Sequence, residues 1–114
     1  MDKQDRALLS RISDEMRIID DLTDGYDFDV FVSDEKTKRA VCMTLINIGE
    51  MVKLLSGGIR QNNPAIPWRS IAGLRDVTAH SYQTVHMEDI WETVCEDIPK
   101  LHGQINELLI KFGE

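Results

Sequence analysis

The sequence predicts an all-α protein, folded as an antiparallel bundle of four to five helices that dimerises. Three long stretches place apolar residues at three- and four-residue steps, which is the period of one face of an α-helix. Glycine and proline separate these stretches. A short alternating run at residues 26–32 would be a lone strand without a partner. Amphipathic helices joined by short breaks are typical of antiparallel bundles.

Length and composition indicate a single domain over residues 1–114. The chain is 42% hydrophobic and 29% charged, which is ordinary for a globular protein. It has no apolar run near the ~20 residues of a membrane span, and its charged first residues lack the apolar core of a signal peptide. Cys42 and Cys95 are isolated in helical patterns, so we expect both to be reduced core residues. These features predict a cytoplasmic protein that does not bind membranes.

The first helix is expected at about residues 3–22, where Gly25 can take the left-handed conformation that follows a helix end. Its apolar stripe consists of Leu8, Ile12, Met16, Ile19 and Leu22. Residues 26–32 are expected to form a short connection, at most one helical turn.

The second helix is expected at about residues 34–56, with Ser33 or Asp34 as its N-cap. Its apolar seam consists of Val41, Leu45, Ile48, Val52 and Leu55. Other apolar residues widen this seam, namely Met43, Ile46 and Met51. A helix that is apolar on more than one side is central to a bundle or shared with a dimer interface. We therefore expect a homodimer.

Gly57 and Gly58 are expected to end the second helix, and residues 59–67 to form a loop. Pro67 suits the first turn of a third helix, which would continue to about residue 80. Trp68 falls on the apolar stripe of that helix, so we expect it in the core.

A turn at residues 81–86 should precede a fourth helix that starts near Met87. Trp91 lies on the apolar side of this helix and is also expected in the core. Pro99 would either kink the helix or start the last one, because proline has no amide to donate. The terminal stripe consists of Leu101, Ile105, Leu108 and Leu109.

The stretch from Arg75 to Tyr82 combines a cation, a carboxylate at Asp76, an imidazole at His80 and a phenol. A guanidinium can hold a phosphate while a histidine moves protons near neutral pH, so this set suits work on a phosphodiester. Arg75 and His80 are about 140° apart on an ideal helix. They converge only if the helix ends near His80 or if a second subunit completes the site. The alternative is a plain helix end, with a histidine favoured by the macrodipole and an Arg75–Asp76 surface pair.

The charge of the chain is unevenly distributed. A net charge of −7 argues against a general affinity for nucleic acid. Residues 51–75, however, contain four bases and no acid, and this basic tract leads directly into the Arg75–Tyr82 stretch. It is either a phosphate-facing surface on an acidic body or a chance gap between acids.

Other site chemistries find no support in the sequence. The three histidines, His80, His86 and His102, do not have the spacing of metal ligands, and the cysteines lack a CxxC pair. Gly57-Gly58 is not followed by the Lys-Ser or Lys-Thr of a phosphate-binding loop, and no serine nucleophile elbow is present. We expect neither a metal nor another cofactor.

The run from Ile66 to Tyr82 reads Ile-Pro-Trp-Arg-Ser-Ile-Ala-Gly-Leu-Arg-Asp-Val-Thr-Ala-His-Ser-Tyr. It resembles the signature of the HepT-like branch of the HEPN superfamily, in which Pro-Trp-Arg precedes Arg-x4-His-x-Tyr. Ile48-Gly49-Glu50 is similar to the Ile-Gly-Glu of that family's second helix, and residues 89–101 are similar to its helix-four ending. Asp76 stands where the family usually has asparagine.

The resemblance implies a dimer of helical bundles whose two Arg-x4-His motifs face each other across a cleft. It implies a metal-independent endoribonuclease that acts on RNA as the toxin of a toxin–antitoxin pair. The antitoxin would be an MNT-type nucleotidyltransferase that adds adenylate to the motif tyrosine. By position, Arg75 and His80 would be catalytic, Tyr82 would be modified, and Asp76 and Glu50 would support the site. The alternative is a non-catalytic helical partner that regulates a small nucleotidyltransferase.

Overall fold

A computed structural model describes residues 2–74 and 86–112 of the chain. These residues form helices and their connections, with no strand among them. The elements are α1 (Lys3–Leu22), α2 (Phe28–Ser33), α3 (Glu35–Lys53), α4 (Gly57–Gln61), α5 (Trp68–Ala72), α7 (Met87–Glu92), the π-helical turn η1 (Thr93–Asp97) and α8 (Ile98–Phe112). The predicted all-α fold is confirmed.

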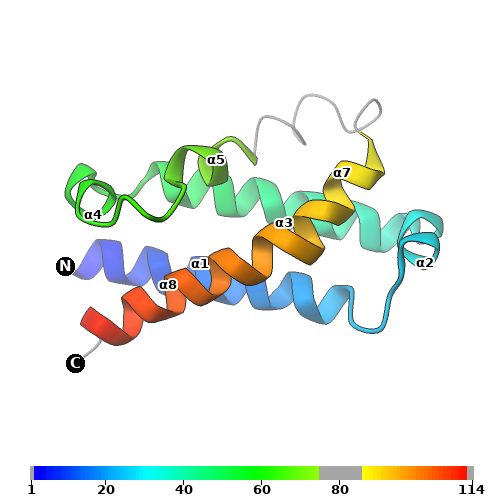
Figure 1. The fold of residues 1–114 in the computed structure, drawn as a ribbon, viewed down its shortest axis with the longest axis horizontal. Coiled ribbons are helices and arrows are strands. Elements are labelled where there is room, and N and C mark those ends of the chain that lie inside the picture. The colour runs from blue at the N-terminus through cyan, green and yellow to red at the C-terminus, as the bar shows by residue number, and fades with distance from the viewer. Residues whose placement is uncertain (1, 75–85, 113–114) are drawn as a thin grey trace.

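Three long helices define the shape of the molecule. α1, α3 and α8 run along its 42 Å length, and α1 is antiparallel to the other two (Figure 1). α1 packs against both α3 and α8. α2 lies at one end, whereas α4 lies at the opposite end together with both termini. α7 and η1 lead directly into α8.

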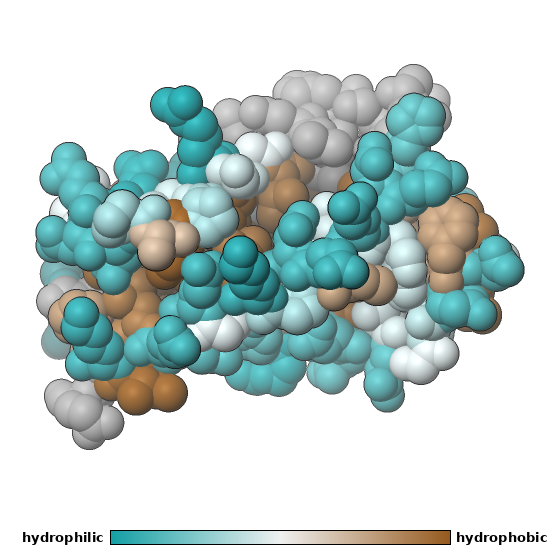
Figure 2. Space-filling view, in the orientation of Figure 1, coloured by the Kyte–Doolittle hydropathy of each residue, from teal (hydrophilic) through white to brown (hydrophobic). Residues whose placement is uncertain are grey.

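The core follows the apolar stripes that the sequence predicts. Fully or almost fully buried side chains come from all three long helices: Leu9, Ile12, Met16 and Ile19; Val41, Leu45, Ile48 and Val52; Ile98, Leu101, Ile105 and Leu108. On α1, the fully buried stripe starts at Leu9 rather than at Leu8, which is only partly buried. The outer face toward the viewer is mostly hydrophilic (Figure 2). Within the described ranges, no helix is long and apolar enough to cross a membrane.

Two expectations about residues 54–67 are corrected. α3 ends at Lys53 rather than near residue 56, and residues 57–61 form the short helix α4 instead of a helix end and loop. The burial of Ile59 favours α4 over a loop, because the Ile59 side chain is only 7% exposed and packs into the core. Pro67 precedes α5 at the N-cap position, one residue before the expected place.

The two cysteines differ in environment. Cys42 is buried as expected, and burial raises the pKa of its thiol to about 11. Cys95 is exposed, which corrects the expectation of a core position. The reason is its phase on the helix, since the neighbouring Val94 occupies the buried position of this turn.

α3 keeps apolar side chains on its outer side. Met43 is 57% exposed and Leu54, just beyond the helix, is 64% exposed, whereas the seam residues are buried. The expected excess of apolar residues on this helix is therefore present. The homodimer stays a prediction.

Asp34 caps α3, as one of the two expected N-caps. Its carboxylate accepts hydrogen bonds from the Tyr26 hydroxyl at 2.6 Å, from the Thr37 amide at 3.1 Å and from the Thr37 hydroxyl at 2.8 Å. These donors, with Tyr26 the strongest, lower the pKa of Asp34 from 3.8 to about 2. The contact also ties the connection after α1 to the start of α3.

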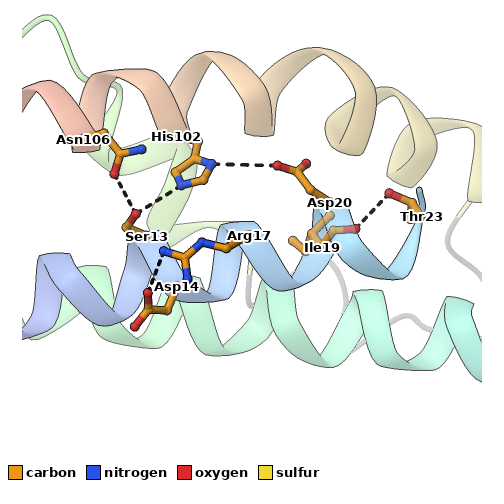
Figure 3. A network of polar contacts seen from close by, with 8 residues as sticks. All are labelled: Ser13, Asp14, Arg17, Ile19, Asp20, Thr23, His102 and Asn106. Carbon is orange, nitrogen blue, oxygen red and sulfur yellow. Dashed lines mark hydrogen bonds and ion pairs between the residues drawn. The ribbon is translucent and has the colours of Figure 1, made fainter. Parts of the chain in front are cut away.

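A polar cluster joins α1 to α8 (Figure 3). The buried Ser13 hydroxyl donates to Asn106 Oδ1 at 2.7 Å and lies 3.1 Å from His102 Nε2. His102 Nδ1 lies 3.9 Å from Asp20 Oδ2, so the imidazole bridges two residues of α1. This cluster fixes the register of the two helices beyond what apolar packing sets.

We expect Ser13→Ala to lower the free energy of unfolding by about 1–3 kcal/mol, because Asn106 and His102 would lose their partner in a partly buried place. Urea denaturation measures the change. Ser10→Ala is the matched control, since Ser10 is exposed on the same helix. Equal stability of the two variants would show that the cluster contributes nothing to the packing of α1 on α8.

We expect Asp34 to stabilise the fold above about pH 4 and to lose this contribution as the pH falls toward 2. The sign follows because the pKa of Asp34 is lowered to about 2 in the folded state, so the unfolded chain takes up its proton first. The difference in unfolding free energy between the parent and Asp34→Asn should therefore shrink from pH 5 to pH 2. Asp21→Asn, an exposed acid of α1, controls for the loss of one charge. A difference that does not change with pH would contradict this role.

Candidate functional site

The four motif residues Arg75, Asp76, His80 and Tyr82 lie outside the described residues, so their roles stay predictions. The remaining expected site residue, Glu50, is exposed on α3 and directly follows the buried Gly49. The structure describes the chain before the motif, up to residue 74, and after the motif, from residue 86. We call these two segments the flanks.

The chain that leads into the motif is anchored in the core. Trp68 is 7% exposed, and its Nε1–H donates to the carbonyl oxygen of Asn63 at 2.9 Å. Ile71 is 1% exposed, and α5 packs against α3. The predicted core position of Trp68 is confirmed. Because α5 is held at these two points, the C-terminal end of α5, just before Arg75 in the chain, has a fixed position.

The chain that leaves the motif is anchored by aromatic packing. α7 begins at Met87, and Ile90 on its inner side is 3% exposed. Trp91 packs its ring on the fully buried Phe31 of α2, with the ring centroids 4.9 Å apart and the planes tilted by 31°. The predicted inward orientation of Trp91 is confirmed, although this large side chain is only partly buried.

A hollow of about 630 Å³ lies between the end of α3, α4 and α5. Lys53, Arg60 and Arg69 line it, and each comes from a different helix. We call it the basic hollow. Three of the four bases of the predicted basic tract therefore share one concave surface, and the fourth, Arg75, lies outside the described residues. The interpretation of the tract as a phosphate-facing surface stays a prediction.

Helix α4, which forms one wall of the basic hollow, is held by a buried carboxylate. Asp5 of α1 is 4% exposed and accepts the backbone N–H of Ser56 at 2.9 Å, and it also accepts the Ser56 hydroxyl. Ser56 is the N-cap residue of α4. This contact could not be predicted from the sequence, because the two residues are 51 positions apart.

A second hollow, of about 240 Å³, lies between α5 and the η1–α8 segment. Its polar lining includes Ser70 of α5, Asp97 of η1 and Lys100 of α8, and its apolar lining includes Ile71. One carboxylate and one ammonium leave this surface without an excess of either charge. It therefore differs from the basic hollow in the ligands that it can attract.

The polar cluster of Figure 3 contains a serine, a histidine and an aspartate, but it is not arranged for nucleophilic catalysis. A nucleophilic serine must pass its proton to the histidine. Here the Ser13 hydroxyl donates to Asn106, so His102 Nε2 is the donor in the Ser13–His102 contact. Ser13 is also buried. Among the described residues, moreover, no three His, Cys, Asp or Glu side chains group as a metal site would require.

Comparisons with known proteins identify the family of this chain. The family model described as "Ribonuclease HepT-like" matches residues 12–108. The chain is 35% identical, over 95% of its length and 98% of the relative, to "Probable ribonuclease HepT" of Thermococcus cleftensis. It is 38% identical, over 96% of its length and 97% of the relative, to "Putative RNase TTE0752" of Caldanaerobacter subterraneus subsp. tengcongensis. No solved structure matches the chain. The match over most of both chains shows that this protein belongs to the HepT-like ribonuclease family.

Proposed function

We propose that this protein is a metal-independent endoribonuclease whose site is completed by a second copy of the chain. The observation that carries the proposal is the family match over residues 12–108, which includes the whole Arg-x4-His-x-Tyr motif. The basic hollow supports it, because it places three cations next to the chain that leads into the motif.

A dimer would bring together motif side chains that point apart within one copy. On an ideal helix Arg75 and His80 point about 140° apart, so these two side chains of one copy are poorly placed to contact the same phosphate. Two copies related by a two-fold axis would bring two arginines and two histidines to one cleft. The exposed Met43 and Leu54 support association, because burying them would remove apolar surface from water.

The chemistry requires only protein groups and RNA. One His80 would remove the proton from a ribose 2′-hydroxyl, whose oxygen attacks the adjacent phosphorus. The bond from phosphorus to the 5′-oxygen breaks, and the His80 of the second copy would give that oxygen a proton. Arg75 would stabilise the charge that develops on the phosphate oxygens. The products are a 2′,3′-cyclic phosphate and a free 5′-hydroxyl.

We further propose that the protein is the toxin of a toxin–antitoxin pair that acts in the cytoplasm. An MNT-type nucleotidyltransferase would neutralise it by adding adenylate to Tyr82. The added group is bulky and carries a phosphodiester charge, so beside Arg75 it would occupy the place of the substrate phosphate. Asp76 would either pair with Arg75 or His80 or repel the phosphate, and Glu50 is a second candidate for a supporting residue.

We expect the purified protein to cleave RNA in the presence of EDTA and to leave 2′,3′-cyclic or 3′-phosphate ends. His80→Ala should lower the rate by about 10²–10⁴-fold, the usual contribution of a general acid or base. Gel analysis of RNA ends measures both. His102→Ala is the control, because His102 belongs to the α1–α8 cluster and lies far along the chain from the motif.

Two results would contradict this mechanism. Cleavage by His80→Ala at the parent rate would assign the proton transfers to another group. A monomer at micromolar concentration, measured by light scattering while the protein is active, would exclude the composite site. If the parent cleaves no RNA but is still modified on Tyr82, the chain would be the non-catalytic partner of a nucleotidyltransferase.

We expect co-expression with a cognate MNT-type nucleotidyltransferase to place adenylate on Tyr82 and to abolish cleavage. Peptide mass spectrometry locates the modification, and Tyr82→Phe should remove it. Tyr26→Phe is the control, since the Tyr26 hydroxyl is engaged with Asp34 at 2.6 Å. Inhibition by the partner without any change of mass at Tyr82 would show that the partner acts by docking alone.

A further inference from the structure

We infer that the basic hollow is a binding site for the phosphate backbone of single-stranded RNA, separate from the residues that cut it. The inference rests on the proposed ribonuclease function for the identity of the ligand. Its observations are independent of the motif, because Lys53, Arg60 and Arg69 all lie among the described residues.

The core holds the backbone positions that carry the three cations. Lys53 directly follows Val52, which is fully buried, and Arg60 directly follows Ile59, which is 7% exposed. Arg69 directly follows Trp68, also 7% exposed. Each cation is therefore attached to a backbone position that a buried neighbour fixes. A fixed backbone lowers the part of the binding entropy that would come from ordering the chain, whereas the cationic side chains still lose their own freedom.

The three cations have N–H groups that are available to hydrogen-bond a ligand. None of the three forms an ion pair with a carboxylate of the described residues. Arg60 makes one weak contact, from its guanidinium to the carbonyl oxygen of Leu55 at 3.4 Å, which leaves most of its five N–H groups available. Lys53 and Arg69 are exposed, whereas Arg60 is half-buried. Three cations around one hollow, with no acid among its described lining residues, favour the binding of a polyanion.

The shape of the hollow suits a chain of phosphates. Two of its lining residues are glycines, Gly57 and Gly73, which leave room for a ligand to approach the backbone. A Cβ built on Gly57 would meet no atom within 4 Å. Arg60 and Arg69 can hold phosphate oxygens with two parallel N–H bonds. Residues of α5, the helix that precedes the motif in the chain, form one wall of the hollow.

A structural role for the same cations gives a different expectation. Lys53, Arg60 and Arg69 each lie in the last turn of a helix, where the macrodipole favours a positive charge. That role explains each position singly. It does not require the three helix ends to meet around one hollow. If it were the whole role, removing the cations would lower stability and leave RNA binding unchanged.

The test is the salt dependence of binding to a fluorescent single-stranded oligonucleotide with 2′-O-methyl groups, which cannot be cleaved by attack of its own 2′-hydroxyl. Replacing Lys53, Arg60 and Arg69 together by Gln should lower the slope of log affinity against log salt by about 2, at ~0.7 per phosphate contact. Such a slope corresponds to roughly twentyfold in affinity between 50 and 200 mM salt. The loss should be the same for oligo-U and oligo-A, because phosphate contacts carry no sequence information.

Two controls separate the site from general charge. The first replaces three exposed bases elsewhere by Gln, namely Arg11, Arg17 and Lys36, which changes the net charge equally. The second compares Gly57→Asp with Gly103→Asp, since a Cβ at either glycine meets nothing within 4 Å. Only the first of these two places a carboxylate in the basic hollow, so only Gly57→Asp should weaken binding. This comparison decides the matter even if the triple variant fails to fold.

The outcomes distinguish this inference from the proposed function. Equal losses in the hollow variant and the Arg11/Arg17/Lys36 control would overturn it, as would unchanged binding in a folded hollow variant. The second result would leave the cations as helix-end charges or as a surface for an acidic protein. If binding depends on the hollow but the parent cleaves no RNA, the inference stands and the proposed ribonuclease mechanism fails.

Discussion

The buried apolar seam of α3 is the packing surface that several other helices share. Its seam of Val41, Leu45, Ile48 and Val52 is fully buried, and α1, α2 and α5 all pack against this one helix. Core side chains of this kind each contribute about 1.5–3 kcal/mol through burial. Because α5 packs against α3, the position of the helix that precedes the motif depends on the same apolar seam that holds the bundle together.

The long helices could be predicted from the sequence because a 3.6-residue period repeats over many turns in each of them. The short helix α4 could not, because five residues are too few to show a period and glycines at its start suggested an end. The basic tract was visible in the sequence, but its convergence on one hollow depends on how α3, α4 and α5 pack. The burial of Asp5 and Ser13 could not be predicted, because their partners are 51 to 93 positions away along the chain.

Charge is distributed on this molecule in a way that affects how a polyanion would approach. The net charge of −7 repels RNA, but at physiological salt mobile ions screen this repulsion at separations beyond about 8 Å. Inside that range the local cations of the basic hollow dominate. Most of the surface of this protein would therefore bind RNA weakly, and RNA binding would be confined to the region of the basic hollow.

The π-helical turn η1 limits how the length of this chain can vary among relatives. An i→i+5 turn contains one residue more than an α-turn, so losing a residue there would rotate α7 by about 100° relative to α8. Ile90 and Trp91 would then turn away from the core and from Phe31. Insertions and deletions in an alignment of this family should therefore fall in connections such as residues 62–67, and the spacing from α7 to α8 should be kept.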